Sequence, residues 1–211
     1  MLETKIDSQK TALLVVDMQN DLVKVKDGAL AELYNMVRAN RVISNTKKTV
    51  KAARKAGLPI VFIKHVLRDD YKDVVPSVTD VMLRGEAPPP RKAMIEGTPG
   101  AEIIDELKPA PGDYVIAKRR GDAFYNTELE LILRSRGVDT LILGGVVTNG
   151  CILATFMGAR ERDFHTIVVS DCCAGTSQEL HDWPMKNLFP RSGRVRTADE
   201  IVAELTRPKK K

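Results

Sequence analysis

Short apolar runs alternate along the chain with longer segments in which apolar residues recur every three to four positions. Six runs rich in β-branched residues predict strands at residues 11–17, 59–65, 113–118, 139–145, 165–171 and 193–197. The periodic segments predict helices within 29–56, at 127–135, 149–161 and 177–187, and from Ala198 onward. This alternation is typical of βαβ units, so it predicts an α/β fold in which a six-stranded parallel sheet is flanked by helices on both faces.

Residues 66–100 form one long stretch with little periodicity. A connection of this length is more typical of a loop or lid over a site than of a simple link. The sequence shows no internal repeat and no domain linker. Because 211 residues with 43% hydrophobic content suffice for one sizeable core, we expect a single domain spanning residues 1–211.

The formal charge of +5 is concentrated in the tail "RPKKK" at 207–211, so the rest of the chain is nearly neutral. No basic stripe is interleaved with aromatic residues, which argues against a nucleic-acid partner. No run reaches the roughly 18 apolar residues of a membrane span, and the N-terminus lacks the apolar region of a secretory signal. We therefore expect a cytoplasmic protein with no membrane partner. Three cysteines, two of them adjacent, predict reduced thiols.

Three chemically capable residues fall at or just after the carboxyl ends of predicted strands: Asp17, Lys118 and Cys151. Ligands of open parallel sheets bind outside these ends, near the point where the strand order reverses. If the first and fourth strands are neighbours there, the three side chains converge. A thiol is nucleophilic as the thiolate, which a helix N-terminus and an ammonium both favour, and an aspartate can accept its proton. The three residues therefore predict nucleophilic catalysis.

Each of these candidates also has a plainer interpretation. Taken alone, Cys151 fits a packed small hydrophobe, Asp17 a turn former at a strand end, and Lys118 a surface charge. The histidines offer no convincing base for a Cys/His pair, because His65 ends a strand and His181 lies in a helix of surface character.

Several residues around these strand ends can each be interpreted in two ways. Gln19 either supports the acid and the substrate or caps a loop, and Arg119 is either a surface charge or the holder of an anionic substrate group. Phe124 fits a core position and a pocket wall equally well. The adjacent cysteines at 172–173 are expected to pack rather than to react.

Three segments together resemble a known family: "ALLVVDMQNDL" (12–22), "GTPGAEI" (97–103) and "VIAKRRGDAFYNTELELILRSRGVDTLILGGVVTNGCILATFMGARERDFHTIVVSDCCAG" (115–175). They closely resemble the isochorismatase-like cysteine hydrolases, which include nicotinamidases, N-carbamoylsarcosine amidohydrolases and the ureide, biuret and triuret hydrolases. The resemblance covers nearly the whole chain. It implies the Rossmann-like isochorismatase-like hydrolase fold, a catalytic triad of Asp17, Lys118 and Cys151, and a homodimer or homotetramer.

The resemblance also implies a special backbone before the cysteine. In that family a non-proline cis peptide precedes the nucleophile, which places it here between Val146 and Val147. The backbone N–H groups of Val147 and Cys151 are then expected to form an oxyanion hole, and Val146 to contact the substrate. Such donors stabilise the negative oxygen that forms when a thiolate attacks a carbonyl.

Two departures from subfamily patterns narrow the predicted activity. Nicotinamidases carry Asp-x-His and a further His after the second strand to hold a metal, whereas this segment reads "KHVLRDDYKD", so we do not expect His65 to bind a metal. Isochorismatases that cleave a vinyl ether can dispense with the cysteine, so its presence favours attack on an amide or carbamoyl carbon. We predict a metal-independent amidohydrolase that needs no cofactor and cleaves a small amide, carbamoyl or ureido substrate through a thioester-like intermediate.

Three alternatives stay open: an isochorismatase-type vinyl ether hydrolase, a non-catalytic binding member of the family, and a dinucleotide-dependent oxidoreductase. The last has little support, because "GGVVTNG" is not G-x-G-x-x-G and the first strand is followed by "MQNDL" rather than by a glycine-rich turn. The sequence does not name the substrate. Its determinants are expected in residues 66–100, around Phe124 and at a subunit interface.

Overall fold

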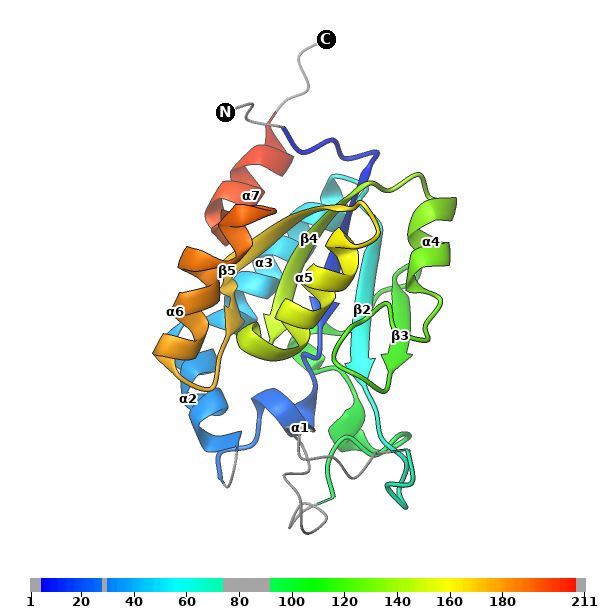
Figure 1. Ribbon diagram of the computed structural model, residues 1–211, viewed down its shortest axis with the longest axis vertical. Coiled ribbons are helices and arrows are strands. Elements are labelled where there is room, and N and C mark those ends of the chain that lie inside the picture. Colours follow the sequence, from blue (N-terminus) through cyan, green and yellow to red (C-terminus); the bar gives the residue numbers. More distant parts are fainter. Residues whose placement is uncertain (1–4, 28–29, 74–91, 208–211) are drawn as a thin grey trace.

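The computed structural model describes residues 5–27, 30–73 and 92–207. Its centre is a parallel sheet of six strands in the order β3-β2-β1-β4-β5-β6 (Figure 1). The strands are β1 (Thr11–Val16), β2 (Ile60–His65), β3 (Tyr114–Lys118), β4 (Thr140–Val146), β5 (His165–Ala174) and β6 (Arg194–Arg196). All six predicted strands are present, and β5 continues three residues beyond its predicted end. The order reverses between β1 and β4, which places the expected ligand edge at their carboxyl ends.

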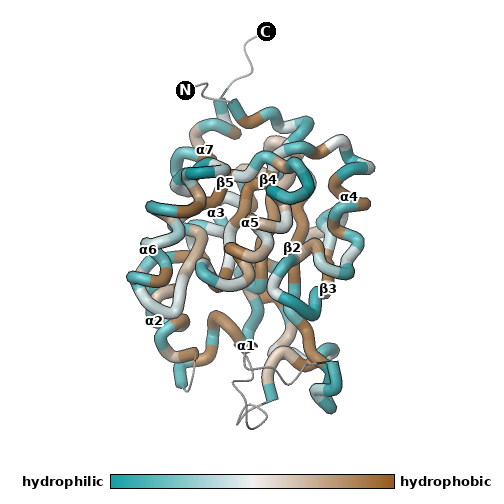
Figure 2. Tube along the Cα trace, in the orientation of Figure 1, coloured by the Kyte–Doolittle hydropathy of each residue, from teal (hydrophilic) through white to brown (hydrophobic). Residues whose placement is uncertain are grey.

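Helices cover both faces of this sheet, as predicted (Figures 1 and 2). One buried cluster joins the sheet to α2 (Ala31–Ala39), α3 (Val42–Lys55) and α7 (Ala198–Thr206). The other joins the opposite face to α4 (Leu129–Ser135), α5 (Leu153–Arg160) and α6 (Gln178–Asn187). Every residue of β1 and β4 is buried, because these central strands have packed layers on both sides.

The helix predicted within residues 29–56 is two helices, so that prediction was wrong in its continuity. The chain breaks between α2 and α3 at Arg41, whose φ of 53° lies in the left-handed region. Asn45 of α3 donates its side-chain N–H to Asn40 O and so ties the two helices together at the break. Neither glycine nor proline marks this turn, and the apolar periodicity continues across it, so the pattern gave no sign of the interruption.

The described parts of the segment at 66–100 are held close to β1. They contain an isolated bridge between Leu67 and Ile95 and a 3₁₀ turn at Pro99–Ala101. Asp21, in the short helix α1 (Asn20–Val23), accepts a hydrogen bond from Met94 N at 2.7 Å. The predicted lid itself falls largely on residues 74–91, outside the described residues.

The helices within residues 5–27, 30–73 and 92–207 are short or carry many polar residues. None of them combines the length and the apolar character that crossing a bilayer demands.

Candidate active site

The carboxyl ends of β1, β3 and β4 bring Asp17, Lys118 and Cys151 together. Lys118 Nζ lies 2.8 Å from Asp17 Oδ2 and 3.2 Å from Cys151 Sγ, and it donates to Arg120 O at 3.0 Å. Asp17 and Lys118 are each only 1% exposed. Because β2 separates β3 from β1, the long lysine side chain is what allows these groups to meet.

The turn that carries Cys151 has the unusual backbone expected from the resemblance. The Val146–Val147 peptide is cis, and residues Thr148–Ile152 form a turn that is kinked at Gly150, where the backbone is not helical, before α5 begins. Val147 O accepts hydrogen bonds from the N–H groups of Gly150 and Ile152, at 3.0 and 3.2 Å. Cys151 therefore lies two residues before the α-helix proper rather than in its first turn, which corrects the predicted helix start at residue 149.

The close approach of β4 to β1 explains why residue 145, just before this turn, is a glycine. Gly145 has a φ of 129°, and a Cβ atom there would lie 1.9 Å from Val16 O of β1. Only a residue without a side chain permits this approach and this conformation together. The β1–β4 contact thus fixes the position at which the chain turns toward Cys151.

The electrostatics of Cys151 differ from the expectation that its neighbours hold it as a thiolate. Burial, reinforced by the Asp17 carboxylate, raises the pKa of Cys151 to about 12, while the Lys118 ammonium acts in the opposite direction without prevailing. Burial also works against the charge of Lys118, but Asp17 and Cys151 outweigh it and raise the pKa of the lysine. The resting site therefore holds a protonated thiol beside a lysine ammonium.

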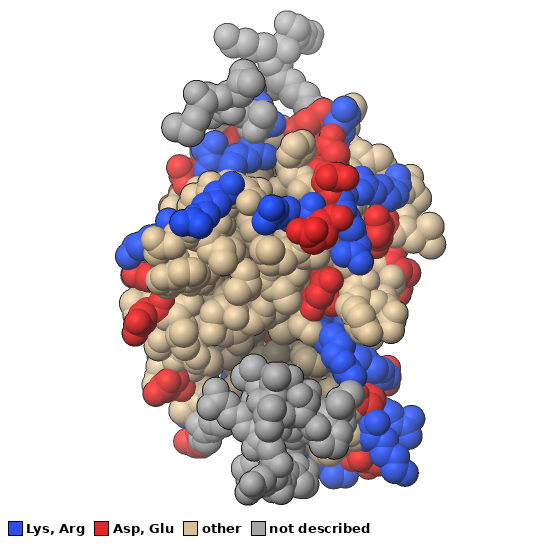
Figure 3. All heavy atoms as spheres, in the orientation of Figure 1, with Lys and Arg blue, Asp and Glu red and all other residues tan. Residues whose placement is uncertain are grey.

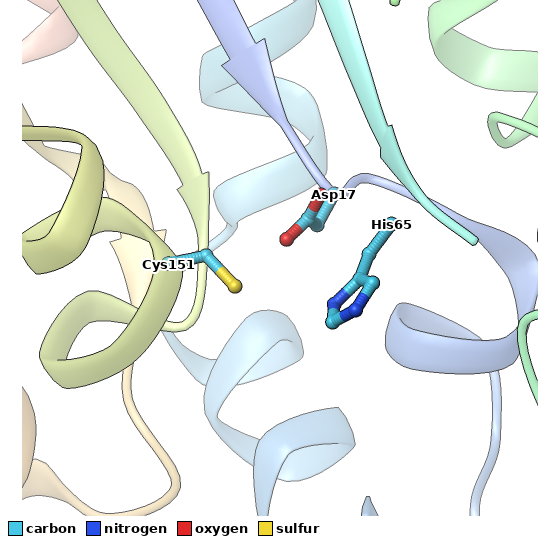
Figure 4. A group of neighbouring side chains, drawn as sticks. All are labelled: Asp17, His65 and Cys151. Atoms are coloured by element: carbon cyan, nitrogen blue, oxygen red, sulfur yellow. The ribbon is translucent and has the colours of Figure 1, made fainter. Parts of the chain in front are cut away.

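His65 is a site residue that sequence analysis did not assign. A ring nitrogen of His65, a carboxylate oxygen of Asp17 and Cys151 Sγ all lie within 4.8 Å of one another (Figure 4). The available signal was register, because His65 ends β2 directly beside Lys118 in the sheet. The three side chains offer nitrogen, oxygen and sulfur ligands that a transition metal accepts. The Lys118 ammonium already supplies positive charge beside two of them, which works against a second cation there.

Three residues expected to contact substrate are buried, so their contact with substrate stays a prediction. Gln19 is fully buried, and its side-chain amide is engaged with backbone groups. Phe124 is 4% exposed and stacks on Phe164 in the core cluster between the sheet and α4–α6, which favours the core interpretation, and its role as a pocket wall stays a prediction. Val146 is fully buried in β4. Its contribution to the site is the peptide that it shares with Val147.

Arg119 is paired with acidic side chains, and His181, which was expected on the surface, is buried. Arg119 pairs with Asp73 at 2.9 Å and with Glu96 at 2.5 Å, so its charge is matched by two carboxylates. His181 is buried rather than on the surface, and its Nδ1 lies 2.9 Å from Thr148 Oγ1. It thereby links α6 to the turn that carries the nucleophile.

Comparison with known proteins agrees with this fold. The isochorismatase domain family matches residues 11–200. An uncharacterized isochorismatase family protein of Bacillus subtilis, YwoC, is 30% identical over 200 residues, which cover 95% of this chain and 96% of the relative. The ureidoacrylate amidohydrolase RutB of Pantoea ananatis is 31% identical over 173 residues, covering 77% of this chain and 68% of that protein.

Solved structures give the same result. An isochorismatase family protein from Desulfovibrio vulgaris superposes with a TM-score of 0.78 at 29% identity, covering 94% of this chain and 99% of that one. The N-carbamoylsarcosine amidase of Thermoplasma acidophilum superposes with a TM-score of 0.70 at 28% identity, covering 90% and 97%. The chain therefore belongs to the isochorismatase family of cysteine hydrolases.

Proposed function

We propose that this hydrolase cleaves a C–N bond of a small amide, carbamoyl or ureido compound, with Cys151 as nucleophile and without a metal. The observation that carries the proposal is the buried contact of Lys118 Nζ with both Asp17 and Cys151, at 2.8 and 3.2 Å. Two relatives named as amidohydrolases, the ureidoacrylate enzyme and the N-carbamoylsarcosine amidase, support the bond type.

The proposed reaction begins from the protonated thiol. As Cys151 Sγ attacks the carbonyl carbon, the thiol proton passes to Asp17, and the Lys118 ammonium stabilises the sulfur as it becomes anionic. The carbonyl oxygen takes up the electron pair and accepts hydrogen bonds from the N–H groups of Val147 and Cys151. A thiol of raised pKa suits this order, because proton transfer accompanies attack rather than preceding it.

Collapse of the tetrahedral adduct breaks the C–N bond. Asp17 returns the proton to the leaving nitrogen, which departs as ammonia or an amine and leaves an acyl or carbamoyl group on sulfur. Water then attacks this intermediate while Asp17 removes its proton, and the C–S bond breaks to restore the thiol. Lys118 keeps Asp17 oriented through both halves of the cycle.

A substrate panel tests the proposal. Nicotinamide, N-carbamoyl amino acids, ureidoacrylate, biuret and isochorismate are incubated with the protein, and ammonia, amine and pyruvate are measured, with Cys151→Ser as the matched control. We expect ammonia or amine release that the control lacks. Pyruvate from isochorismate without C–N cleavage would identify the vinyl ether hydrolase instead. A thiol inert to iodoacetamide, with no product from any substrate, would identify a binding protein.

A further inference from the structure

The imidazole of His65 lies at the centre of the proposed reaction and has no role in it so far. Its ring nitrogen lies within 4.8 Å of both an Asp17 oxygen and Cys151 Sγ (Figure 4). The side chain is half-buried, at the end of β2, whereas Asp17 and Lys118 are almost fully enclosed. His65 and the half-buried Cys151 are therefore better placed than Asp17 and Lys118 to meet an arriving molecule.

Buried hydrogen bonds fix the backbone of His65 in place. Gln19 Oε1 accepts from His65 N at 2.8 Å, and Gln19 Nε2 donates to His65 O and to Ala101 O, each at 2.8 Å. The next residue, Val66, donates its N–H to Lys118 O at 2.9 Å. A fully buried amide thus holds the strand end against β1 and against the turn at 99–101. Such support is what a side chain needs if it is to hold one orientation toward a substrate.

The reaction geometry places the substrate's leaving group next to His65. A carbonyl carbon bonded to Cys151 Sγ directs its oxygen to the N–H groups of Val147 and Cys151, and its leaving nitrogen to the oxygen of Asp17 that protonates it. A leaving nitrogen within about 3 Å of Asp17 is also near the imidazole, because a ring nitrogen of His65 lies within 4.8 Å of an Asp17 oxygen. Any substituent on this nitrogen therefore comes within reach of the His65 ring.

We propose that His65 is a specificity-determining residue that donates a ring N–H to a carbonyl or carboxylate oxygen carried by the leaving nitrogen of the substrate. This inference rests on the proposed function and names its substrate class: carbamoyl and ureido compounds whose scissile nitrogen bears an acyl or carboxyalkyl group. Simple primary amides lack that oxygen and gain nothing from His65. An imidazole is suited to this contact, because it can donate one hydrogen bond without bringing a permanent charge beside Lys118.

Matched substrates and variants test the assignment. For N-carbamoylglycine and N-ethylurea, which differ in the carboxylate beyond the scissile nitrogen, kcat and KM are measured with the wild type and His65→Asn. For the oxygen-bearing compound of the panel that is turned over best, an analogue without that oxygen is made, and the two are compared in the same way. We expect His65→Asn to lower kcat/KM for the oxygen-bearing substrate about 10- to 100-fold, mainly through KM, and to change the analogue less than about threefold.

Two controls separate this inference from the proposed function. His165→Asn alters an exposed histidine at the amino end of β5 and is expected to change neither substrate. Alkylation of Cys151 by iodoacetamide is expected to proceed at the wild-type rate in His65→Asn, which shows an intact site. Equal losses on both substrates, or a wild type that prefers primary amides, would overturn the role of His65 while leaving the amidohydrolase in place. A wild type that cleaves no C–N bond overturns the proposed function itself.

Discussion

Cys151, which is half-buried, and Cys172, which is buried, are two thiols whose neighbours differ. Burial raises the pKa of each to about 12. Cys172 Sγ lies 3.5 Å from the neutral hydroxyl of Thr49, whereas Cys151 Sγ lies 3.2 Å from the Lys118 ammonium. The resting pKa therefore does not distinguish them. What distinguishes Cys151 is a carboxylate that can accept its proton and a cation that can stabilise the resulting sulfur anion.

The largest expected effect is on turnover, which should differ between the variants in which each cysteine is replaced by serine. Cys151→Ser should lower turnover by roughly 1,000-fold or more, because the hydroxyl is a far weaker nucleophile at nearly unchanged volume. Cys172→Ser should keep turnover near the wild-type value, since it removes no reacting atom. Product release is measured alongside circular dichroism and thermal unfolding. Turnover by Cys151→Ser within about tenfold of wild type would contradict the nucleophile assignment.

Removing the cation should affect only one of the thiols. Lys118→Met should raise the pKa of Cys151 further, so that iodoacetamide alkylation at a fixed pH slows about tenfold or more and its pH profile moves to higher pH. Lys118→Arg should keep part of the thiol reactivity but lose most turnover, because a planar guanidinium does not match the position of a compact ammonium.

Lys64→Met serves as the matched control for the lysine variants. Lys64 lies near the end of β2, beside the strand that Lys118 ends, but pairs with Glu102 at 2.8 Å, away from the sulfur contact. In Lys64→Met, the pH profile of Cys151 alkylation should match that of the wild type. If Lys118→Met also leaves the profile unchanged, Lys118 does not stabilise the thiolate and serves only to orient Asp17.

The alkylation rate of wild-type Cys151 should depend on pH in a way that reveals the raised pKa. With a pKa of about 12, the thiolate fraction grows about tenfold per pH unit from neutral to strongly alkaline pH. The rate, followed by mass spectrometry of the Cys151 peptide, should rise throughout that range. A plateau near neutral pH would mean that the free protein already holds a thiolate.

The smallest expected effect concerns His181, which contacts the turn that carries Cys151. Cys172 does not lie on this turn. Burial lowers the pKa of His181 below 6.5, so the unfolded chain binds more protons than the folded one as pH falls below that value. The stability from neutral His181 is therefore complete above about pH 6.5 and is lost as pH falls toward the folded pKa. Denaturant unfolding of wild type and His181→Gln between pH 5 and about 7.5 measures this. If the free energy of unfolding depends equally on pH in the two proteins, the role of His181 is contradicted.

The sequence predicted the sheet and the meeting of Asp17, Lys118 and Cys151 because parallel strands deliver their carboxyl ends to one edge, whatever their separation along the chain. It did not predict His65, because a histidine at a strand end becomes informative only when the register beside Lys118 is known. The break at Arg41 escaped detection because a left-handed residue other than glycine leaves no mark in apolar periodicity. Phe124 could not be assigned, since core and pocket wall require the same side chain.

The uncharged middle of one face, over α5 and α6, contrasts with its charged rims (Figure 3). Met157, Leu180 and Trp183 of these helices are among the exposed large hydrophobic residues. The homodimer or homotetramer implied by the family resemblance stays a prediction, and the mass of the wild type by light scattering, compared with Trp183→Glu, would test whether this face takes part.

The two glycines near the end of β4 set limits on how this protein can be engineered. A Cβ at Gly145 would collide with the backbone of β1, and one at Gly144 would press on Cys172 Cβ at 3.0 Å. A saturation library at Gly145 would consist mostly of misfolded clones, whereas a substitution at Gly144 requires Cys172 to shift. New substrate preferences should be sought at Arg119, His65 and residues 66–73, where sequence can change without closing the gap between the two central strands.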